Sequence, residues 1–368
     1  MDFDADLFVA GGGPAGLAAA IAARAKGFSV IVADGGKPPI GKTCGEGLLP
    51  DAVAELRNLK IAFAPSDGCP LYGIRFDDLR SSVEARFRGG LGFGVRREVL
   101  HQRMVERAEE CGVMLAWNTP VTGLYDEGAI AGGTKVRARW VIGADGSSSR
   151  VRRWAGLERA ASRKGRFAFR RHYGAAAWSD FTEVYWQADA QAYVTPVGRN
   201  EICVAFIADR SDVRGGALLR RFPELATRLA DAPFADSERG AVTRTSGLRR
   251  VSRGRVALVG DASGTVDAIT GEGLSLGFRQ ARALAEALSS EDLRQYERQH
   301  RLLSRRPRFM ANVLLFLSRS PEIRRRTFQV MNAAPNIFDC MLAYHVGETK
   351  PLELAATGAQ FSWRFLTV

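Results

Sequence analysis

The chain has 368 residues, of which 46% are apolar and 25% are charged, so it is long enough for two domains or one elaborated domain with a sizeable core. The formal net charge is +12, but the basic residues are spread along the chain without a helix-turn-helix, RRM or zinc-finger pattern, which argues against nucleic-acid binding. We find neither a signal-peptide pattern nor an apolar run long enough to cross a bilayer, since the longest late run covers only 309–317, and we expect a cytoplasmic protein.

The cysteines and histidines predict no metal site. The five cysteines are scattered and form no Cys-x-x-Cys pair, and the four histidines have no metal-ligand spacing. The absence of a Cys-x-x-Cys pair also argues against a disulfide reductase.

The N-terminal segment has the pattern of a strand, a turn, a helix and a second strand. The apolar run 6–10 predicts the first strand, the Ala-rich run 17–26 predicts the helix, and the apolar run 28–33 predicts the second strand, which ends at Asp34. The turn that joins the first strand to the helix consists of Gly11, Gly12, Gly13, Pro14, Ala15 and Gly16.

This combination indicates a bound dinucleotide. Gly11 permits a tight turn, Gly13 lets the backbone approach a pyrophosphate, and Gly16 lets the helix pack closely on the strand. The helix begins at this turn and offers free N–H groups and a positive dipole end to the phosphates. Asp34 can accept hydrogen bonds from a ribose diol.

Alternating, aromatic-rich segments in the middle of the chain predict half-buried antiparallel strands, because period-two patterns with aromatic and β-branched residues are typical of such strands. These segments are 73–76, 83–87, 167–170, 183–186, 192–194 and 201–207. A helical period over 97–111 and a short apolar run at 113–116 fit the nucleotide-binding part instead.

We therefore expect an α/β fold: a Rossmann-type nucleotide-binding domain interrupted by an antiparallel β-sheet substrate domain, with a helical C-terminal tail. The nucleotide-binding domain is assigned to 1–65, 95–160 and 245–300, the substrate domain to 66–94 and 161–244, and the helical region to 301–368.

Two further predicted strands end in an aspartate within a glycine turn. The strand at 141–143 leads to Asp145, and the strand at 256–259 leads to Gly260 and Asp261. Because ligands of open α/β sheets bind beyond the carboxyl ends of the strands, both aspartates are candidate ligand contacts.

A glycine pair opens the helix that follows the last of these strands. Gly271 and Gly273, just before Leu274, permit a close backbone approach. The positive end of this helix would stabilise a flavin ring, whose reduced form is anionic.

In this order the three motifs resemble the FAD-dependent aromatic-hydroxylase-like flavoprotein superfamily, which includes flavin monooxygenases, flavin halogenases and geranylgeranyl reductases. The resemblance covers roughly residues 1–300 and implies that the dinucleotide is FAD. It places the ADP half at Gly11, Gly13, Gly16 and Asp34.

The resemblance also assigns the rest of the cofactor. It places Arg97 near the phosphates, Asp145 towards the approach of the pyridine nucleotide, Asp261 at the ribityl chain and Gly271 to Leu274 at the ring. The segment 42–48 is similar to a Cys-Gly segment beside the flavin of geranylgeranyl reductases, which makes Lys42 a cofactor contact and places Cys44 and Glu46 near the ring. The sequence departs from many hydroxylases at 261–264, which lacks their His, and at 268–269, which lacks their Pro.

Three functions stay open at this point, and we rank the first slightly above the second and the third last. The first is an NAD(P)H-using monooxygenase that hydroxylates a lipophilic phenolic or polyketide-type substrate through a C4a-hydroperoxyflavin, with His172, Tyr173 or Tyr185 as the base. The second is a reductase of carbon–carbon double bonds with Cys44 or Glu46 near the ring, and the third is a non-catalytic FAD-binding redox sensor. The aromatic-rich sheet favours the first, whereas 42–48 and 271–273 favour the second.

No second dinucleotide fingerprint is present, so we expect NADPH or NADH to dock only transiently as the reductant. In the tail, the apolar run 309–317 is flanked by arginines. The segment 305–326 could make peripheral contact with an anionic membrane, or it could cap the core of the substrate domain; short apolar helices are usually buried, which favours the cap. Either role favours a small lipophilic substrate.

Overall fold

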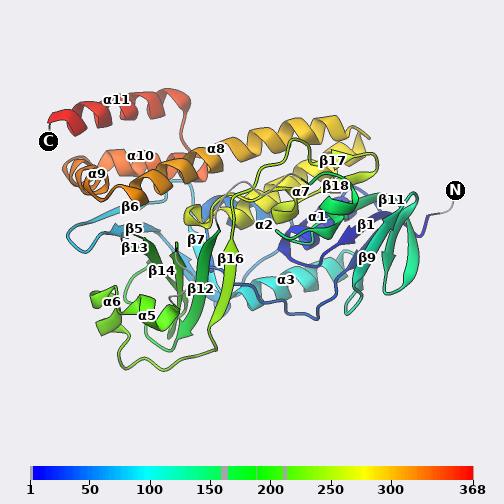
Figure 1. Ribbon diagram of the computed structural model, residues 1–368, viewed down its shortest axis with the longest axis horizontal. Helices are drawn as coiled ribbons and strands as arrows, with labels where there is room; N and C mark the ends of the chain where they lie inside the picture. Colours follow the sequence, from blue (N-terminus) through cyan, green and yellow to red (C-terminus); the bar gives the residue numbers. More distant parts are fainter. Residues whose placement is uncertain (1–2, 159–164, 188, 210–213, 368) are drawn as a thin grey trace.

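The computed structural model describes residues 3–158, 165–187, 189–209 and 214–367. Its elements form a nucleotide-binding part with a mainly parallel sheet, a second part with a mainly antiparallel sheet, and a layer of C-terminal helices (Figure 1). The expected α/β class, with a Rossmann-type sheet, a separate antiparallel sheet and a helical C-terminal region, is confirmed.

The first sheet is built around β1 (Ala5–Ala10), which is buried along almost its whole length. Its strand order is β17-β18-β11-β1-β2-β8, and the pairs β18–β11, β11–β1, β1–β2 and β2–β8 are parallel. The other strands of this sheet are β2 (Val30–Ala33), β8 (Met114–Ala116), β9 (Val121–Tyr125), β10 (Gly128–Ala131), β11 (Thr134–Gly143), β17 (Ser252–Arg253) and β18 (Val256–Leu258). Strands buried on both faces read as continuous apolar runs, which is why β1 and β2 were visible in the sequence, whereas β9, β10 and β17 were not predicted.

Helices cover the first sheet and bring its glycine turn close to a second helix start. These helices are α1 (Pro14–Arg24), α2 (Pro50–Asn58), α3 (Arg97–Glu110) and α7 (Gly273–Ser289), with the short α4 (Arg150–Trp154) beside them. Helix α1 packs on α7 through small side chains, and a Cβ added at Gly277 of α7 would stand 3.5 Å from the Cβ of Ala15. Close packing therefore places the N-termini of α1 and α7 at one end of the sheet.

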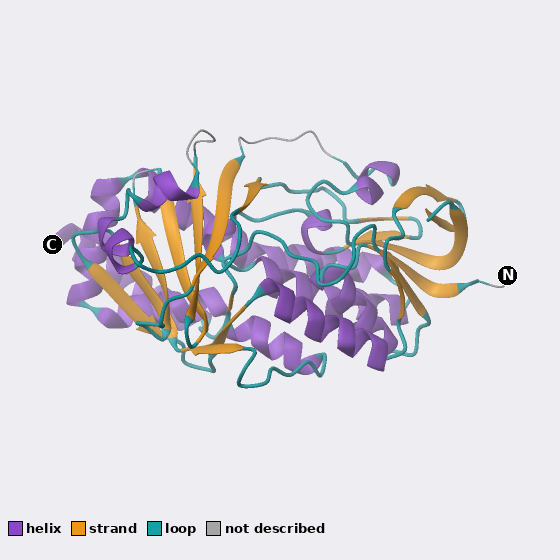
Figure 2. Ribbon diagram, turned by 90° about the horizontal axis from the view of Figure 1, so that it is seen from below, coloured by secondary structure: helices purple, strands orange, loops and turns teal. Residues whose placement is uncertain are grey.

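The second sheet has seven strands in the order β16-β12-β15-β14-β13-β5-β6 (Figure 2). They are β5 (Gly73–Asp77), β6 (Ser82–Arg86), β12 (Arg166–Tyr173), β13 (Phe181–Trp186), β14 (Ala190–Gly198), β15 (Glu201–Ala208) and β16 (Arg239–Thr243). Every neighbouring pair is antiparallel except β5 and β13, which run parallel. A small sheet of β3 (Gly47–Leu48), β7 (Gly92–Val95) and β4 (Gly68–Leu71) joins this part to the first.

Each face of the second sheet is covered. The short helices α5 (Gly215–Leu219) and α6 (Pro223–Arg228) bury one apolar face together with Tyr185 and Phe206. The other face packs against α8 (Leu293–Arg319), α9 (Pro321–Ala333) and α10 (Pro335–Val346), and α11 (Pro351–Thr367) lies on α9 and α10. The domain limits drawn from the sequence stay a prediction.

The tail is more helical than its apolar run indicated. Helix α8 extends over 27 residues and continues through Pro307, well beyond the apolar run at 309–317. Within the described part of the chain, no helix combines the length and apolar content needed to cross a bilayer.

Candidate active site

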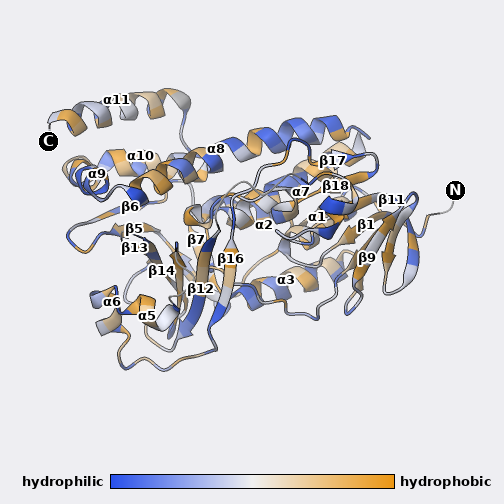
Figure 3. Ribbon diagram, in the orientation of Figure 1, coloured by the Kyte–Doolittle hydropathy of each residue, from blue (hydrophilic) through white to orange (hydrophobic). Residues whose placement is uncertain are grey.

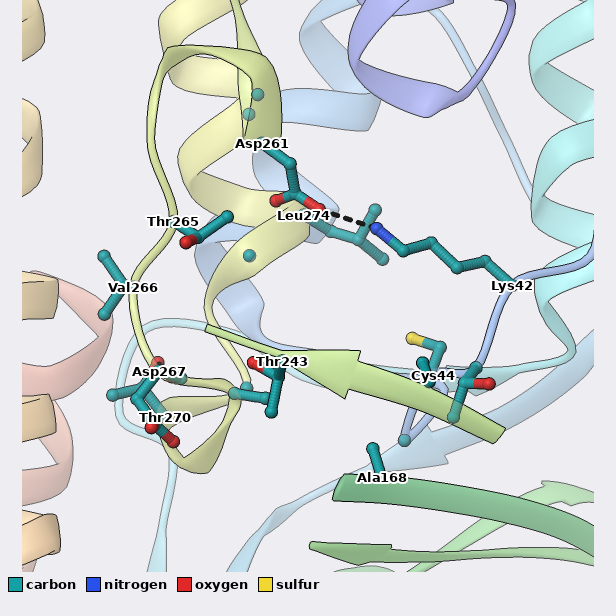
Figure 4. Close-up of a pocket in the computed structure, with 18 of the residues that line it drawn as sticks. Lys42, Cys44, Ala168, Thr243, Asp261, Thr265, Val266, Asp267, Thr270 and Leu274 are labelled. Atoms are coloured by element: carbon teal, nitrogen blue, oxygen red, sulfur yellow. Dashed lines mark hydrogen bonds and ion pairs between the residues drawn. The ribbon is translucent and has the colours of Figure 1, made fainter. Parts of the chain in front are cut away.

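One cavity of about 790 Å³ connects the two sheets. It begins at the carboxyl ends of β1 and β2, passes the loop 40–49 and the turn 265–274, and ends between the second sheet and helices α8, α9 and α10. Figure 4 shows the middle of this cavity, where Lys42 and Cys44 stand on one wall and Asp267 and Thr270 on another. Of the cofactor residues expected from the sequence, all line the cavity except Gly16.

The glycines form a cradle with no side chains. A Cβ added at Gly13, Gly271 or Gly273 would meet no protein atom within 4 Å, and all three residues face the cavity. At Gly16 a Cβ would lie 1.9 Å from the carbonyl oxygen of Gly11, so this glycine serves the packing of α1 on β1. The residues present therefore fit a large, flat and phosphorylated ligand that approaches the backbone closely.

Asp34 can still accept hydrogen bonds from a ligand at the end of the cavity next to β1 and β2. Its Oδ2 accepts from the Gly12 N–H at 2.7 Å and its Oδ1 accepts from the Gly36 N–H at 2.7 Å. These bonds fix the carboxylate beside the glycine turn. Because each carboxylate oxygen has a second lone pair, Asp34 can also accept from the hydroxyls of a ribose.

Arg97 supplies a buried positive charge at the cavity wall. It is the first residue of α3, is only 8% exposed, and its Nε has no hydrogen-bond partner among the described residues. A desolvated guanidinium next to a cavity suits a phosphate, which can accept from it in bidentate fashion.

His101 holds this wall in place, and the sequence analysis missed it. The Ile40 N–H donates to Nδ1 at 3.3 Å, so the proton sits on Nε2, which donates to the Gly12 carbonyl oxygen at 2.8 Å. Burial lowers the pKa of His101, and the ring is neutral at pH 7. No spacing signal connects His101 to the glycine turn, because the contact arises only when α3 packs on α1.

The carboxylate of Asp145 is bound by the helix that follows it. Its Oδ1 accepts from the Ser149 hydroxyl at 2.5 Å, and its Oδ2 accepts from the Arg150 N–H at 2.7 Å and the Val151 N–H at 3.1 Å. Both oxygens thus cap the first turn of α4. Asp145 borders the cavity, but its carboxylate is engaged by the protein's own donors.

Lys42 and Asp261 meet across the cavity. Lys42 Nζ lies 2.6 Å from Asp261 Oδ2, although the residues are 219 positions apart (Figure 4). Both side chains are partly exposed, and such ion pairs typically contribute less than about 1 kcal/mol. The pair is therefore weak enough to open, which leaves the Asp261 carboxylate accessible to the hydroxyls of a polyol chain.

Cys44 and Glu46 share a loop but face different surroundings. The thiol of Cys44 points into the cavity (Figure 4) and accepts from the Glu46 N–H at 3.4 Å. Glu46 also lines the cavity, but its side chain is fully buried, and its φ of 60° is unfavourable for a glutamate. Its Oε1 accepts from the Arg97 N–H at 3.1 Å, and its Oε2 lies 2.6 Å from His172 Nε2.

His172 is completely buried, and it is not among the described residues that line the cavity. Its Nδ1 lies 2.9 Å from Asp236 Oδ2, so both ring nitrogens face carboxylates. Burial by itself lowers the pKa of His172, but the bonds with Glu46 and Asp236 outweigh it and raise the pKa above the ordinary value. The structure thus does not bring His172 to the substrate as a base.

The two tyrosines named as alternative bases are also remote from the cavity. Tyr173 and Tyr185 belong to the apolar cluster on the far face of the second sheet. The Tyr185 hydroxyl donates to Glu183 Oε2 at 2.8 Å, and burial raises the pKa of Tyr185.

One group of possible metal ligands exists among the described residues. Ligand atoms of Glu46, His172 and Cys203 lie within 4.8 Å of one another. The guanidinium of Arg170, itself fully buried, contacts the same cluster at 3.8 Å from Glu46 Oε1. A fixed cation in this place disfavours a metal ion, and the expected lack of a metal stays a prediction.

The far end of the cavity is apolar, and most of the residues that line it were given no role in the sequence analysis. Its walls come from β5, β13 and β14 on one side and from α8, α9 and α10 on the other. The lining residues are Ile74, Phe76, Val184, Trp186, Tyr193, Met310, Leu314, Leu317, Phe328, Met331, Phe338, Met341 and Leu342. The segment 309–317 therefore caps the second sheet, as the pattern of a short apolar helix favoured.

Two polar groups mark the border between this apolar chamber and the glycine turn. The Tyr193 hydroxyl donates to the Ile269 carbonyl oxygen at 2.9 Å, and His345 Nε2 lies 2.9 Å from the Thr270 carbonyl oxygen. Burial raises the pKa of Tyr193, so this hydroxyl stays protonated. Both residues tie the chamber walls to the turn that precedes α7.

Comparisons with known proteins agree with this geometry. A family model described as "FAD binding domain" matches residues 4–305. The chain is 30% identical to a menaquinone reductase of Mycobacterium tuberculosis over 331 residues, 80% of this chain and 78% of that protein. It is 26% identical to a digeranylgeranylglycerophospholipid reductase of Methanosarcina acetivorans over 316 residues, 78% of this chain and 77% of that protein.

Solved structures show the same fold. A flavoprotein/dehydrogenase from Cytophaga hutchinsonii superposes with a TM-score of 0.84 at 17% identity, covering 98% of each chain. A geranylgeranyl bacteriochlorophyll reductase-like protein from Thermoplasma acidophilum superposes with a TM-score of 0.75 at 21% identity, covering 99% of this chain and 98% of the other. With its glycine cradle, its buried arginine and these matches, the chain belongs to the FAD-binding-domain family of FAD-dependent oxidoreductases.

Proposed function

We propose that this chain is an FAD-dependent reductase of carbon–carbon double bonds in a lipophilic, prenyl-type substrate. One observation carries the proposal: the cavity that begins at the glycine cradle continues into a chamber whose walls are almost entirely apolar. Such a chamber suits a long hydrocarbon chain better than a small polar ring. The relatives named as menaquinone and digeranylgeranylglycerophospholipid reductases support the same class of reaction.

The reaction needs a hydride on one alkene carbon and a proton on the other. FAD, when bound and reduced, would supply hydride chemistry, with NADPH or NADH as the source of the two electrons. The proton must come from a group on the cavity wall. Of the two candidates named from the sequence, Cys44 is favoured, because its thiol faces the cavity whereas the Glu46 carboxylate is engaged by His172 and Arg97.

The chain's other residues exclude water and orient the substrate. Leu314, Phe328 and Phe338 close the chamber from three different helices, and Trp186 forms part of the opposite wall. Exclusion of water protects the reduced cofactor from side reactions and strengthens electrostatic interactions near the ring.

Hydroxylation of an aromatic substrate remains the second candidate. It is favoured by the aromatic side chains that gather in the chamber, where the ring centroids of Phe76 and Trp186 are 5.5 Å apart and those of Phe76 and Phe338 are 5.1 Å apart. These rings could stack on a phenol or polyketide. We place this second because the thiol and the apolar chamber are both used by a reductase.

Stopped-flow spectroscopy tests the proposal. The FAD-loaded protein is reduced without oxygen and mixed either with an anaerobic prenyl lipid that has no quinone ring, or with oxygenated buffer. We expect the prenyl compound alone to reoxidise the flavin, and oxygen to reoxidise it slowly without an intermediate. A C4a-hydroperoxyflavin spectrum with oxygen, together with no reaction with prenyl compounds, would instead establish the monooxygenase.

A further inference from the structure

Helix α11 presents an apolar face that no described residue covers. Its inner side packs on the neighbouring helices through Phe361 and Phe365. Its outer side exposes large apolar side chains, with Leu352 83%, Trp363 71% and Leu366 78% exposed. Figure 3 colours this helix largely pale or orange, in contrast to the blue first half of α8.

The exposed apolar residues of α11 form a continuous stripe. Six exposed positions stand at helical spacing, so they fall on one face. They are Leu352, Ala355, Ala356, Ala359, Trp363 and Leu366, and we call them the α11 stripe. The stripe contains no charged side chain, and Trp363 has the amphipathic ring that favours a membrane–water interface.

Positive charge lies beside this stripe. Residues 319–367, from the end of α8 through α11, contain 6 basic and 4 acidic side chains, a net of +2. Arg326 places its guanidinium 5.1 Å from the centroid of the Phe365 ring of α11, and the exposed Arg325 next to it pairs with Glu322 at 2.6 Å. Apolar residues bordered by arginines complement an anionic bilayer surface, which attracts the charges and takes up the apolar side chains.

The size of the stripe disfavours a second copy of the chain as its occupant. A helix of 17 residues is about 26 Å long and about 10 Å wide, so its exposed face offers roughly 260 Å². A stable protein–protein interface buries about 800 Å² on each partner. Half of the stripe consists of alanine, which provides little anchoring for a protein partner.

The position of α11 connects this surface to the cavity. Helix α11 lies outside α9 and α10 (Figure 1), and Phe338, Met341 and Leu342 of α10 line the cavity. The segment 305–326 faces the same cavity through Met310, Leu314 and Leu317. Its exposed side carries Phe309 and Phe316, which are 52% and 56% exposed, whereas the three large apolar side chains of the α11 stripe are each more than 70% exposed. We propose that the α11 stripe docks this protein onto an anionic lipid bilayer, which places the roof of its cavity at the membrane surface.

Sedimentation of the full chain, loaded with FAD, tests this proposal. The protein is mixed with vesicles of phosphatidylcholine alone or of phosphatidylcholine with phosphatidylglycerol, at low and at high salt. We expect binding to the anionic vesicles at low salt and weaker binding at high salt. The triple variant Leu352→Ser, Trp363→Ser and Leu366→Ser should bind the anionic vesicles at least about tenfold more weakly than the wild type, because the apolar anchors are lost.

The controls separate this result from misfolding and from self-association. Met114, 63% exposed on β8, is a matched apolar residue outside the helical layer, and Met114→Ser should bind like the wild type. Retained FAD absorbance shows that the triple variant is folded. The proposal is overturned if the wild type stays in the supernatant with anionic vesicles, if the triple variant sediments equally well, or if light scattering shows a dimer that the triple variant abolishes.

Discussion

Glu46 and His172 join the loop at the cavity to the second sheet through a bond of 2.6 Å between Glu46 Oε2 and His172 Nε2. The residues are 126 positions apart, and both side chains are fully buried. The Glu46 N–H also donates to the Cys44 sulfur at 3.4 Å, so the same residue contacts the thiol that faces the cavity. Asp236 and Arg170 complete the cluster from the sheet side.

Removing the charge of Glu46 should weaken the folded state. In Glu46→Gln the amide can keep a hydrogen bond, but His172 and Arg170 lose a buried carboxylate. We expect the free energy of unfolding to fall by about 3 kcal/mol, the size typical of breaking a buried pair. Chemical denaturation of the apoprotein measures this loss. Glu353→Gln is the control, because Glu353 is 40% exposed in its pair with Arg88 and should cost less than about 1 kcal/mol.

The same cluster should make stability depend on pH. The pKa of His172 is raised in the folded state, so its contribution is fully present below its unfolded pKa of about 6.5 and is lost as the pH rises through the folded value. Arg96 and Arg170 also face Nδ1 and limit the size of the effect.

Denaturation of the wild type and of His172→Gln across the neutral range measures this contribution. The stability difference should be greatest at low pH within this range and shrink towards alkaline pH. A difference that grows with pH would contradict a protonated His172.

Gly13 and Gly16 should separate cofactor binding from folding. A Cβ at Gly13 enters open cavity, so Gly13→Ala should leave the stability of the apoprotein within about 0.5 kcal/mol of the wild type and weaken FAD binding by about tenfold or more. A Cβ at Gly16 would meet the Gly11 carbonyl oxygen at 1.9 Å, so Gly16→Ala should destabilise the apoprotein itself. Equal stability of the two apoprotein variants would refute the assigned roles.

Arg97 should contribute affinity for the FAD phosphates. A hydrogen bond to a charged group is worth about 1.5–3 kcal/mol, so Arg97→Ala should raise the Kd for FAD by roughly 10- to 150-fold. Quenching of FAD fluorescence measures the Kd. Arg282 of α7 serves as the control, since it pairs with Glu55 of α2 and is half exposed, and Arg282→Ala should bind FAD normally. An unchanged Kd for Arg97→Ala would remove Arg97 from the cofactor site.

Cys44 should donate the proton rather than serve the cofactor. We expect Cys44→Ala to lower alkene reduction by about 100-fold, the range typical of general acid catalysis, and to leave flavin reduction by NADPH unchanged. Cys69 is the matched control, because it is not among the described residues that line the cavity. Full activity of Cys44→Ala would show that another group donates the proton. The Tyr193 hydroxyl would then be the next candidate donor.

The nucleotide-binding half was predictable because its signals are local. The strand at 6–10, the glycine turn and the helix that follows all lie within 30 residues, and their spacing follows from the geometry of a single βαβ unit. The turn at Gly271 and Gly273 was visible for the same reason.

The interior of the site was less predictable because it depends on contacts between distant segments. The pattern around Glu46 could indicate that it lies near the flavin, but not that its carboxylate turns to a histidine on β12. No sequence motif indicated that the helices of the tail form walls of the cavity. Leu314, Phe328 and Phe338 line it, but in the sequence they look like ordinary apolar positions of a helix. Asp145 illustrates the opposite case, in which a motif position is engaged by the protein's own backbone.

The central claim is that this flavoprotein reduces an alkene in a lipophilic chain. Mass spectrometry of the product is the most direct measurement, with a prenyl lipid that has no quinone ring, NADPH and labelled oxygen present together. The account predicts a product that gains two hydrogens for each double bond lost and no labelled oxygen. A product that carries labelled oxygen and keeps its double bonds would contradict it.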